Sequence, residues 1–394
     1  MRSTFVPENL PHRDDQIKVI TQIIAPALSQ NNHSISNIFL YGKTGTGKTV
    51  CALYVLKHFM AKCRELGRED IQTAFLNCRD VDTSYRVLAR LCENIGLSIP
   101  FTGLPTDVVY DKFKDKLDEN ENSLLIIVLD EIDQLVKKSH GKRTPNKALY
   151  ELTRVNSSLK NSRVHLIGIS NDLNFKNYLD SRILSSLGEE ELVFPPYNSL
   201  ELEDILKERA KMGLSDGSID DGTISLAAGL AASEHGDARR AIDLLRVSSE
   251  LAERSGSQLV TREHVRLAIR NIEHDKIKES VETLPLQSKL VLCSIYLLEK
   301  KNLEENTTGD VYSAYVEICS ELSLIDPLTQ RRISDLINEL DMLGLINAKL
   351  VSLGRYGRTK KIKLSIPRNI VEDMIRHDPT LSRLIDFDLQ YEKE

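Results

Sequence analysis

The chain has 394 residues, of which 41% are hydrophobic and 28% charged, and its formal net charge at pH 7 is -6. This length predicts about two or three domains with ample core, and the mildly acidic balance excludes a uniformly basic nucleic-acid binder, so any such site must be local. Continuous apolar stretches fall far short of the roughly 20 residues that span a bilayer, and the N-terminus lacks the apolar region of a signal peptide. We therefore expect a cytoplasmic protein with no membrane partner.

The first motif directly follows an apolar stretch at residues 38–41. It fills every fixed position of the phosphate-loop pattern G-x-x-x-x-G-K-[ST] and reads Gly42-Lys43-Thr44-Gly45-Thr46-Gly47-Lys48-Thr49. In such a loop the glycines let backbone N–H groups turn inward around a β-phosphate, and the lysine reaches the β- and γ-oxygens. The alternative, a plain glycine turn between a strand and a helix, needs every fixed position to agree by chance.

The residues at the end of this loop add a metal ligand and a helix. The hydroxyl of Thr49 is a ligand for Mg²⁺ in this motif, and Lys48 is the cation for the phosphates. A helix beginning near Gly47 directs the positive end of its dipole at the same site. We therefore predict that residues Gly42 to Val50 bind ATP or ADP together with Mg²⁺.

Short apolar strands alternate with helical stretches through the first half of the chain. The strands are expected near residues 38–41, 73–77, 124–129 and 164–170. This alternation is typical of an α/β fold with a parallel sheet and crossover helices, in which phosphate sites lie at the carboxyl ends of the strands. The phosphate loop follows the first of these strands, as that rule requires.

Two further strands end in polar residues that suit phosphate chemistry. Asp130 and Glu131 follow the continuously apolar run 124–129, so Asp130 is expected to hold Mg²⁺ through water and Glu131 to orient or deprotonate the attacking water. Asn171 follows the next strand and can fix that water or contact the γ-phosphate. Read alone, the acidic pair could be a strand-capping turn and Asn171 a turn residue.

Residues 198–275 carry apolar side chains at helical spacing, interrupted by glycines at 213, 217, 222 and 236. This pattern predicts short helices joined by tight turns, which together form a small helical lid. Contacts from bound nucleotide to both the lid and the core would let hydrolysis change how the lid is held.

The last part of the chain predicts a winged helix. Helices are expected near residues 286–298, 308–322 and 328–343, followed by a polar hairpin over 345–366. The helix beginning near Pro327 would enter the major groove, and the cationic hairpin tip would grip the minor groove or the backbone. The predicted DNA contacts are Thr329, Gln330, Arg331, Arg332, Ser334, Arg355, Tyr356, Gly357, Arg358, Thr359 and Lys360. A charge run of this kind can also be only a solvated face.

Taken together, these motifs resemble a known family. The phosphate loop, the segment 130–133, Asn171 and the segment 179–187 are similar to an AAA+ ATPase. More narrowly, residues 185–197 (SSLGEEELVFPPY), 236–241 (GDARRA) and 354–359 (GRYGRT) resemble the archaeal Orc/Cdc replication initiators. The likeness runs from about residue 7 to about residue 376.

The resemblance assigns further roles. Arg182 matches the arginine finger that reaches a neighbouring subunit's γ-phosphate; the alternative is a local salt bridge with Asp180 or Glu189. Arg239 matches the sensor-2 arginine, with Arg240 the weaker candidate. Tyr197 and Arg209 match positions that line the nucleotide pocket, and the segment 10–13 matches the one that closes over the base. The implied catalytic set is Lys48, Asp130, Glu131, Asn171, Arg182 and Arg239, and the implied additional nucleotide contacts are Pro11, Arg13, Tyr197, Arg209 and Arg239.

The family likeness implies an AAA+ P-loop parallel-sheet core over residues 1–195, a helical lid over 196–278 and a C-terminal winged-helix domain over 279–394. It implies an ATPase with slow, switch-like hydrolysis that binds double-stranded origin DNA at the nucleoid and helps recruit the replicative helicase. A second initiator subunit stays open as a further partner, as does a second DNA contact between residues 81 and 105. The alternatives are an ATP-switched transcription regulator and a clamp-loader-like remodelling ATPase.

Overall fold

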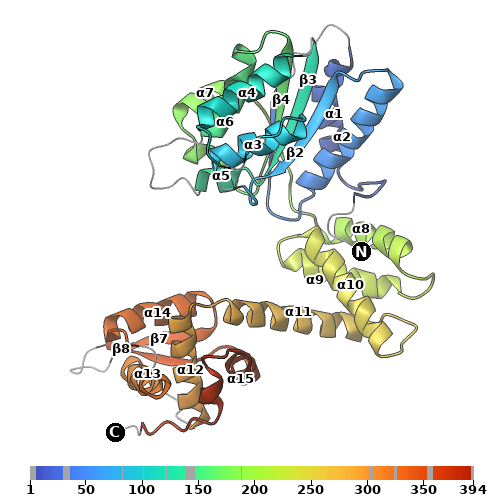
Figure 1. Cartoon of the computed structure of the whole chain (residues 1–394). Coiled ribbons are helices and arrows are strands. Elements are labelled where there is room, and N and C mark those ends of the chain that lie inside the picture. The colour runs from blue at the N-terminus through green and yellow to red at the C-terminus, as the bar shows by residue number, and fades with distance from the viewer. Residues whose placement is uncertain are drawn as a thin grey trace. The chain divides into compact units, whose positions relative to one another are not determined.

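The computed structural model describes residues 6–29, 36–81, 83–100, 102–119, 122–137, 147–187, 189–301, 306–323, 326–352 and 358–391 (Figure 1). Contacts divide the chain into two compact units, Met1–Leu267 and Ala268–Glu394. This division falls inside the helix α11 (Arg262–Glu282). The domain boundaries expected after residues 195 and 278 stay predictions; the first falls in the linker after a strand and the second inside α11.

A five-stranded sheet in the order β2-β3-β4-β1-β5 forms the centre of the first unit, and every pairing in it is parallel. Its strands are β1 (Asn37–Tyr41), β2 (Ile71–Asn77), β3 (Ser123–Asp130), β4 (Ser162–Ser170) and β5 (Glu189–Val193). The predicted parallel sheet is therefore confirmed, with β5 as an edge strand that the apolar pattern missed. Glutamates occupy the first positions of β5, and this hid the strand.

The strand register places three chain segments side by side at the edge of the sheet formed by the carboxyl ends of its strands. Tyr41 pairs with Ser170, Leu129 pairs with Gly168, and Asn77 pairs with Asp130. The segments that leave β1, β3 and β4 therefore emerge side by side, as expected for a parallel sheet. The phosphate loop, Asp130 and Asn171 follow these strands and share that edge.

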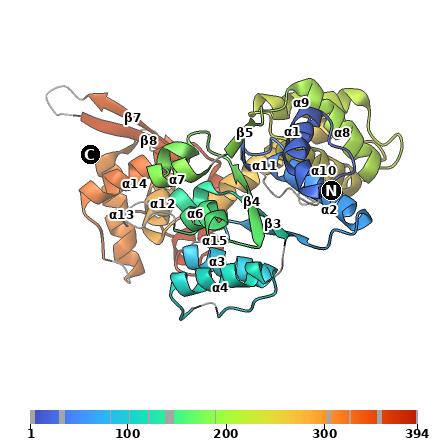
Figure 2. The ribbon, with the colours of Figure 1, turned by 90° about the horizontal axis from the view of Figure 1, so that it is seen from above.

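Helices cover both faces of the sheet, which explains why β3 is buried almost throughout (Figures 1 and 2). Ile38 and Leu40 of β1 pack into the core under α1 (Asp14–Ile24) and α2 (Lys48–Glu65). Phe39 and Tyr41 point into the opposite core. The helices of that opposite face are α3 (Ser84–Asn94), α4 (Thr106–Asp118), α6 (Lys147–Arg154) and α7 (Ser181–Leu187). Shorter elements are α5 (Asp133–Lys137) and the 3-10 turns η1 (Ala25–Leu28), η2 (Val155–Ser157) and η3 (Phe175–Tyr178).

The helical segment after β5 has the expected organisation. It contains α8 (Ser199–Gly213), α9 (Asp221–Ser233), α10 (Ala238–Arg254) and α11. Ile224, Ala227 and Ala231 are buried at helical spacing, as the sequence predicted. Gly222 lies in the first turn of α9 and not at a break between helices, because Asp220 accepts the Thr223 N–H and starts the helix ahead of it.

Among the described residues, no single helix is both long and apolar enough to cross a membrane. The pair Arg262–Glu282 and Leu286–Lys300 reaches the length and composition threshold only when both helices are taken together, and the pair is bent by 119°.

His165 in the middle of β4 is a buried polar residue without hydrogen bonds. Its side chain is 1% exposed, and neither ring nitrogen has a partner. Burial lowers the pKa of His165 to about 4 from an ordinary value of 6.5. The folded protein therefore binds fewer protons than the unfolded chain below pH 6.5, so stability falls as the pH falls from 6.5 towards 4.

We expect His165→Leu to remove this acid sensitivity. The wild-type protein should lose roughly 2 kcal/mol more stability than the variant between pH 7 and pH 5, because only the wild type has this ring to protonate on unfolding. Urea unfolding at both pH values measures the difference. Equal pH dependence in the two proteins would contradict the assignment of a buried, neutral imidazole.

The second unit is built around α12 (Leu286–Lys300), whose residues Leu290 to Leu298 are all buried. It packs with α13 (Thr308–Leu322) and α14 (Gln330–Met342) over an antiparallel sheet in the order β6-β8-β7. The sheet strands are β6 (Asn306–Thr307), β7 (Ile346–Ser352) and β8 (Arg358–Leu364). The chain ends with α15 (Arg368–His377) and the 3-10 turn η5 (Ser382–Ile385).

This arrangement confirms the predicted winged helix, with three differences. The sheet has a third strand, β6, which is too short to leave a sequence pattern. The recognition helix begins at Gln330, and Thr329 is its N-cap, accepting the Arg332 N–H at 3.5 Å. Helix α15 was not predicted, although its buried Ile370, Val371, Met374 and Ile375 have helical spacing after a proline.

Candidate functional site

The phosphate loop curls tightly between β1 and α2. Gly45 and Gly47 have φ values of 72° and 91°, which suit glycine. The Lys48 ammonium, 4% exposed, donates to the carbonyl oxygens of Gly42 at 2.8 Å and Lys43 at 2.7 Å. The Thr46 hydroxyl also donates to the Lys43 carbonyl, at 2.9 Å. The loop therefore keeps its lysine inside the curve where phosphates bind in this motif.

A hydroxyl and a carboxylate meet beside this lysine. The Thr49 hydroxyl donates to Asp130 Oδ2 at 3.0 Å, and the N–H of Glu131 donates to Asp130 Oδ1 at 2.9 Å. Burial raises the pKa of Asp130, opposed by these hydrogen bonds and by nearby cations. Burial also lowers the pKa of Lys48 to about 8, opposed by the charge of Asp130. Burial therefore disfavours the charged form of each group, and the opposite charge of the other group partly compensates for it.

Asp133 joins the ends of β3 and β4 at the site. It is 2% exposed and accepts hydrogen bonds from the Ser170 hydroxyl at 3.3 Å and the Asn171 N–H at 3.2 Å. Glu131 has a left-handed backbone with φ 52°, and its neighbour Asp130 is the last residue of β3. Glu131 and Asn171 consequently line the same pocket as the phosphate loop.

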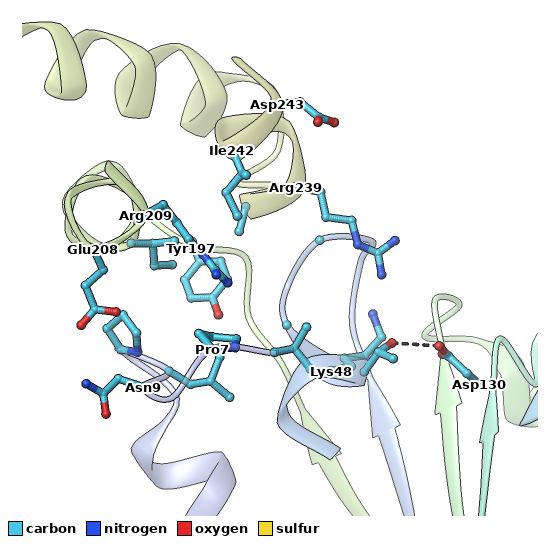
Figure 3. A pocket seen from close by; sticks show the side chains of 18 of the residues that line it. Pro7, Asn9, Lys48, Asp130, Tyr197, Glu208, Arg209, Arg239, Ile242 and Asp243 are labelled. Atoms are coloured by element: carbon cyan, nitrogen blue, oxygen red, sulfur yellow. Dashed lines mark hydrogen bonds between the residues drawn. The ribbon is translucent and has the colours of Figure 1, made fainter. Parts of the chain in front are cut away.

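The pocket extends from this edge of the sheet to the helices after β5, as Figure 3 shows. One side is formed by the N-terminal segment with Pro7, Asn9, Leu10 and Pro11. The opposite side is formed by Tyr197, Ile205, Glu208 and Arg209, and by Ala238, Arg239, Ile242 and Asp243 of α10. A cavity with a cationic, glycine-rich end and a partly apolar end suits a nucleotide, with phosphates at one end and a base at the other.

Arg13 lies behind the phosphate loop and does not line the pocket. Its side chain is 2% exposed, and it donates to the carbonyl oxygens of Thr46 at 3.0 Å and Pro195 at 2.8 Å. Its guanidinium lies 3.7 Å from the centre of the Tyr197 ring. Arg13 thus braces the loop against the linker that leads into α8, while Tyr197 faces the pocket. A direct contact of Arg13 with nucleotide stays a prediction.

In the second unit, a hollow collects several residues expected to contact DNA. It is lined by Thr307, Thr308, Gly309, Gln330, Arg331, Ser334, Leu350, Thr359 and Lys360. Helices α13 and α14 both begin there, so their positive dipole ends add to the charges of Arg331 and Lys360. Such a surface suits phosphate groups and base edges.

Other predicted DNA contacts fall elsewhere. Arg332 is exposed but lies outside the hollow, with its guanidinium 3.9 Å from Asp335 and 3.8 Å from Glu339. Arg355, Tyr356 and Gly357, and the side chain of Arg358, lie outside the described residues.

Three family models match consecutive parts of the chain. They are an AAA domain over residues 32–175, a Cdc6 AAA+ ATPase-type lid domain over 203–270 and a CDC6 C-terminal winged helix domain over 279–374. The ORC1-type DNA replication protein 1 of Archaeoglobus fulgidus is 48% identical over 393 residues, covering 100% of this chain and 93% of the relative. The ORC1-type DNA replication protein of Pyrococcus horikoshii is 50% identical over 394 residues, covering 99% and 92%.

The chain belongs to the ORC1-type DNA replication proteins. Among solved structures, that of the Aeropyrum pernix ORC1 protein in complex with DNA is similar, with a TM-score of 0.80 and 44% identity over 97% of this chain and 96% of that chain. The family resemblance seen in the sequence is therefore confirmed. The protein is an AAA+ ATPase that binds nucleotide and acts as a replication initiator.

The structure separates the arginines expected of an ORC1-type protein. Arg239 lines the pocket from the start of α10, whereas Arg240 is paired with Glu234 at 2.9 Å. Arg182 on α7 is 62% exposed and donates to Asp180 at 2.9 Å, a bond that lowers the pKa of Asp180 to about 2. The local salt bridge anticipated as an alternative is thus present, and the finger role of Arg182 stays a prediction.

Sequence reasoning missed several pocket residues. Ile205 lies one helical turn before Arg209, and Ile242 and Asp243 lie one turn after Arg239. Their spacing from the two arginines was the available signal. Glu208 directly precedes Arg209 and has no such spacing. Pro7 and Asn9 left no comparable signal, because their place depends on the fold of the whole unit.

Proposed function

We propose that this ORC1-type protein binds origin duplex DNA through the hollow at the start of α13 and α14, and that ATP in the pocket controls its grip on that DNA. We further propose that the DNA-bound protein helps to recruit the replicative helicase. The proposal rests chiefly on the hollow, where Arg331, Lys360 and two helix N-termini converge in a winged helix. The DNA complex of the 44% identical Aeropyrum pernix protein supports it.

The residues at the phosphate loop fit Mg²⁺ bound with ATP. The Thr49 hydroxyl and the buried Asp130 carboxylate already meet at 3.0 Å, and both are oxygen ligands of the kind Mg²⁺ prefers. Mg²⁺ would take its other ligands from the phosphates and from water. When bound, Mg²⁺ would neutralise charge on the phosphate oxygens.

We assign the remaining steps of hydrolysis to groups that line the pocket. Lys48 binds the β- and γ-phosphate oxygens, and Asn171 holds the attacking water. Glu131 accepts the proton of that water as its oxygen attacks the γ-phosphorus, and the bond from the γ-phosphorus to the bridging oxygen breaks to release ADP. Arg239 contacts the γ-phosphate from α10 and thereby reports its presence to the lid. Arg182 would exchange Asp180 for the γ-phosphate of a second subunit, where one assembles.

We favour a replication initiator over the two alternatives, a transcription regulator and a clamp-loader-like ATPase, because the similar relatives are DNA replication proteins.

We also propose a second DNA contact near α3. Arg86 and Arg90 are exposed there, with Arg90 paired to Glu93 at 2.8 Å.

Depletion of the protein in its own cells tests the proposal. Sequencing depth along the chromosome peaks at active origins, and we expect at least one peak to flatten as the protein is depleted. A peak profile that does not change, with transcription altered at many promoters, would instead support a regulator.

A further inference from the structure

The start of α10 lies directly on the phosphate loop. The N–H of Ala238 donates to the carbonyl oxygen of Gly45 at 3.1 Å. The Asp237 side chain packs against Gly45 so closely that a Cβ atom added at Gly45 would lie 1.7 Å from Asp237 Oδ1. A larger residue at Gly45 would therefore force the Asp237 carboxylate to move from its present place. Glycine at position 45 therefore suits both the left-handed backbone and the close contact with Asp237.

The same carboxylate organises the backbone that carries Arg239. Asp237 is the N-cap of α10, and its Oδ1 accepts the N–H of Arg239 at 2.8 Å and that of Arg240 at 3.3 Å. The Arg239 side chain leaves the helix at this capped turn and extends towards the end of the pocket that holds Lys48 (Figure 3). Arg239 and Lys48 are close enough that the charge of Arg239 helps to lower the pKa of Lys48.

An acidic side chain is electrostatically unfavourable at this place. A carboxylate beside a phosphate loop repels the phosphates that the loop binds, so Asp237 should weaken nucleotide affinity by its charge alone. Its contacts are with the α10 backbone and Gly45, which makes a geometric role the better explanation.

We propose that Asp237 is a positioning residue that caps α10 and seats it on Gly45, and thereby fixes Arg239 where it can contact a γ-phosphate. This inference rests on the proposed role of Arg239. Nucleoside triphosphates and diphosphates differ at the γ-phosphate, so the position of α10 on Gly45 should govern the discrimination between ATP and ADP. Binding of the parts common to both nucleotides should be left intact.

The test compares Asp237→Ala, Asp237→Ser and Arg239→Ala in the full-length protein, with ATP and ADP dissociation constants, kcat and KM as readouts. We expect Arg239→Ala and Asp237→Ala each to reduce the ATP preference over ADP and kcat by about tenfold or more, as for the loss of a charged hydrogen bond. The ADP affinity of Asp237→Ala should stay within about twofold or improve, because this substitution removes a negative charge beside the phosphate loop. Serine, a neutral cap, should keep most of the ATP preference.

A second comparison isolates the contact with Gly45. Gly45→Ala strains the left-handed backbone equally in the wild-type and Asp237→Ala backgrounds, but it meets the carboxylate only in the first. We expect the loss of ATP preference from Gly45→Ala to be several-fold smaller in the Asp237→Ala background.

The outcomes separate the two ideas. An unchanged ATP preference in Arg239→Ala overturns the proposed role of Arg239 and, with it, the positioning role of Asp237. A lost ATP preference in Arg239→Ala but wild-type behaviour in Asp237→Ala overturns the positioning role of Asp237 alone. Equal effects of Gly45→Ala in both backgrounds overturn the contact between Asp237 and Gly45. Circular dichroism and a cooperative thermal unfolding transition show that each variant has folded.

Discussion

Glu131→Gln should leave ATP binding nearly unchanged and lower the rate of ATP hydrolysis by about 10²–10⁴-fold, the range lost when a general base is removed. The reason lies in its position: Glu131 follows β3 directly and lines the pocket beside Asp130 and Asn171. Glutamine keeps the size of the side chain and places no new demand on the left-handed backbone, so the fold should survive. Single-turnover hydrolysis and equilibrium ATP binding measure the two quantities separately.

Glu208→Gln is the matched control for this variant. Glu208 lines the same pocket, but from α8, on the side away from Lys48 (Figure 3). The same chemical change there should alter kcat by less than a few-fold, because no water attacks at that end of the pocket. Hydrolysis at the wild-type rate by Glu131→Gln, or an equal loss in both variants, would contradict the assignment of Glu131.

Arg331→Ala combined with Lys360→Ala should weaken duplex binding by roughly 10–100-fold while leaving ATP affinity intact. Each lost cation–phosphate contact should reduce the magnitude of the slope of log affinity against log salt by about 0.9. Each lost base contact should cost about 1–3 kcal/mol of binding free energy. Both side chains line the hollow where α13 and α14 begin. Titrations of one duplex at several salt concentrations give both the affinity and the slope.

Arg376→Ala serves as the control for these substitutions. Arg376 is an exposed cation in the last turn of α15 and does not line the hollow. The substitution Arg376→Ala removes one positive charge from the same unit. If net charge alone governed DNA binding, this variant would also bind duplex more weakly. The hollow is not the DNA site if duplex affinity and salt slope stay at their wild-type values in the double variant.

Arg355→Ala combined with Arg358→Ala removes two cations from the hairpin tip. We expect this variant also to bind duplex more weakly, with a smaller salt slope and unchanged ATP affinity.

The parts of the fold and site predicted from sequence are those that local chemistry determines. A phosphate loop needs glycines and a lysine at fixed spacing, and a fully buried strand such as β3 needs a continuous apolar run, so both could be read directly. The same holds for α14, whose cap and apolar spacing lie within one segment.

Long-range contacts account for what sequence reasoning missed. Arg13 donates to carbonyl groups 33 and 182 residues away, and no local pattern shows that it braces the phosphate loop in this way. Asp237 could be read as a helix cap from its position before α10, yet its contact with Gly45 depends on how the lid meets the core. Asp133 ties β3 to β4 in the same way.

The central claim is that ATP controls binding to origin DNA. Purified protein should select sheared DNA from its own genome at fixed, near-physiological salt, with and without ATP, because affinities depend steeply on salt. We expect ATP-dependent enrichment of one or a few non-coding loci that carry repeated elements. Enrichment spread over many promoters, or none under either condition, would contradict the claim.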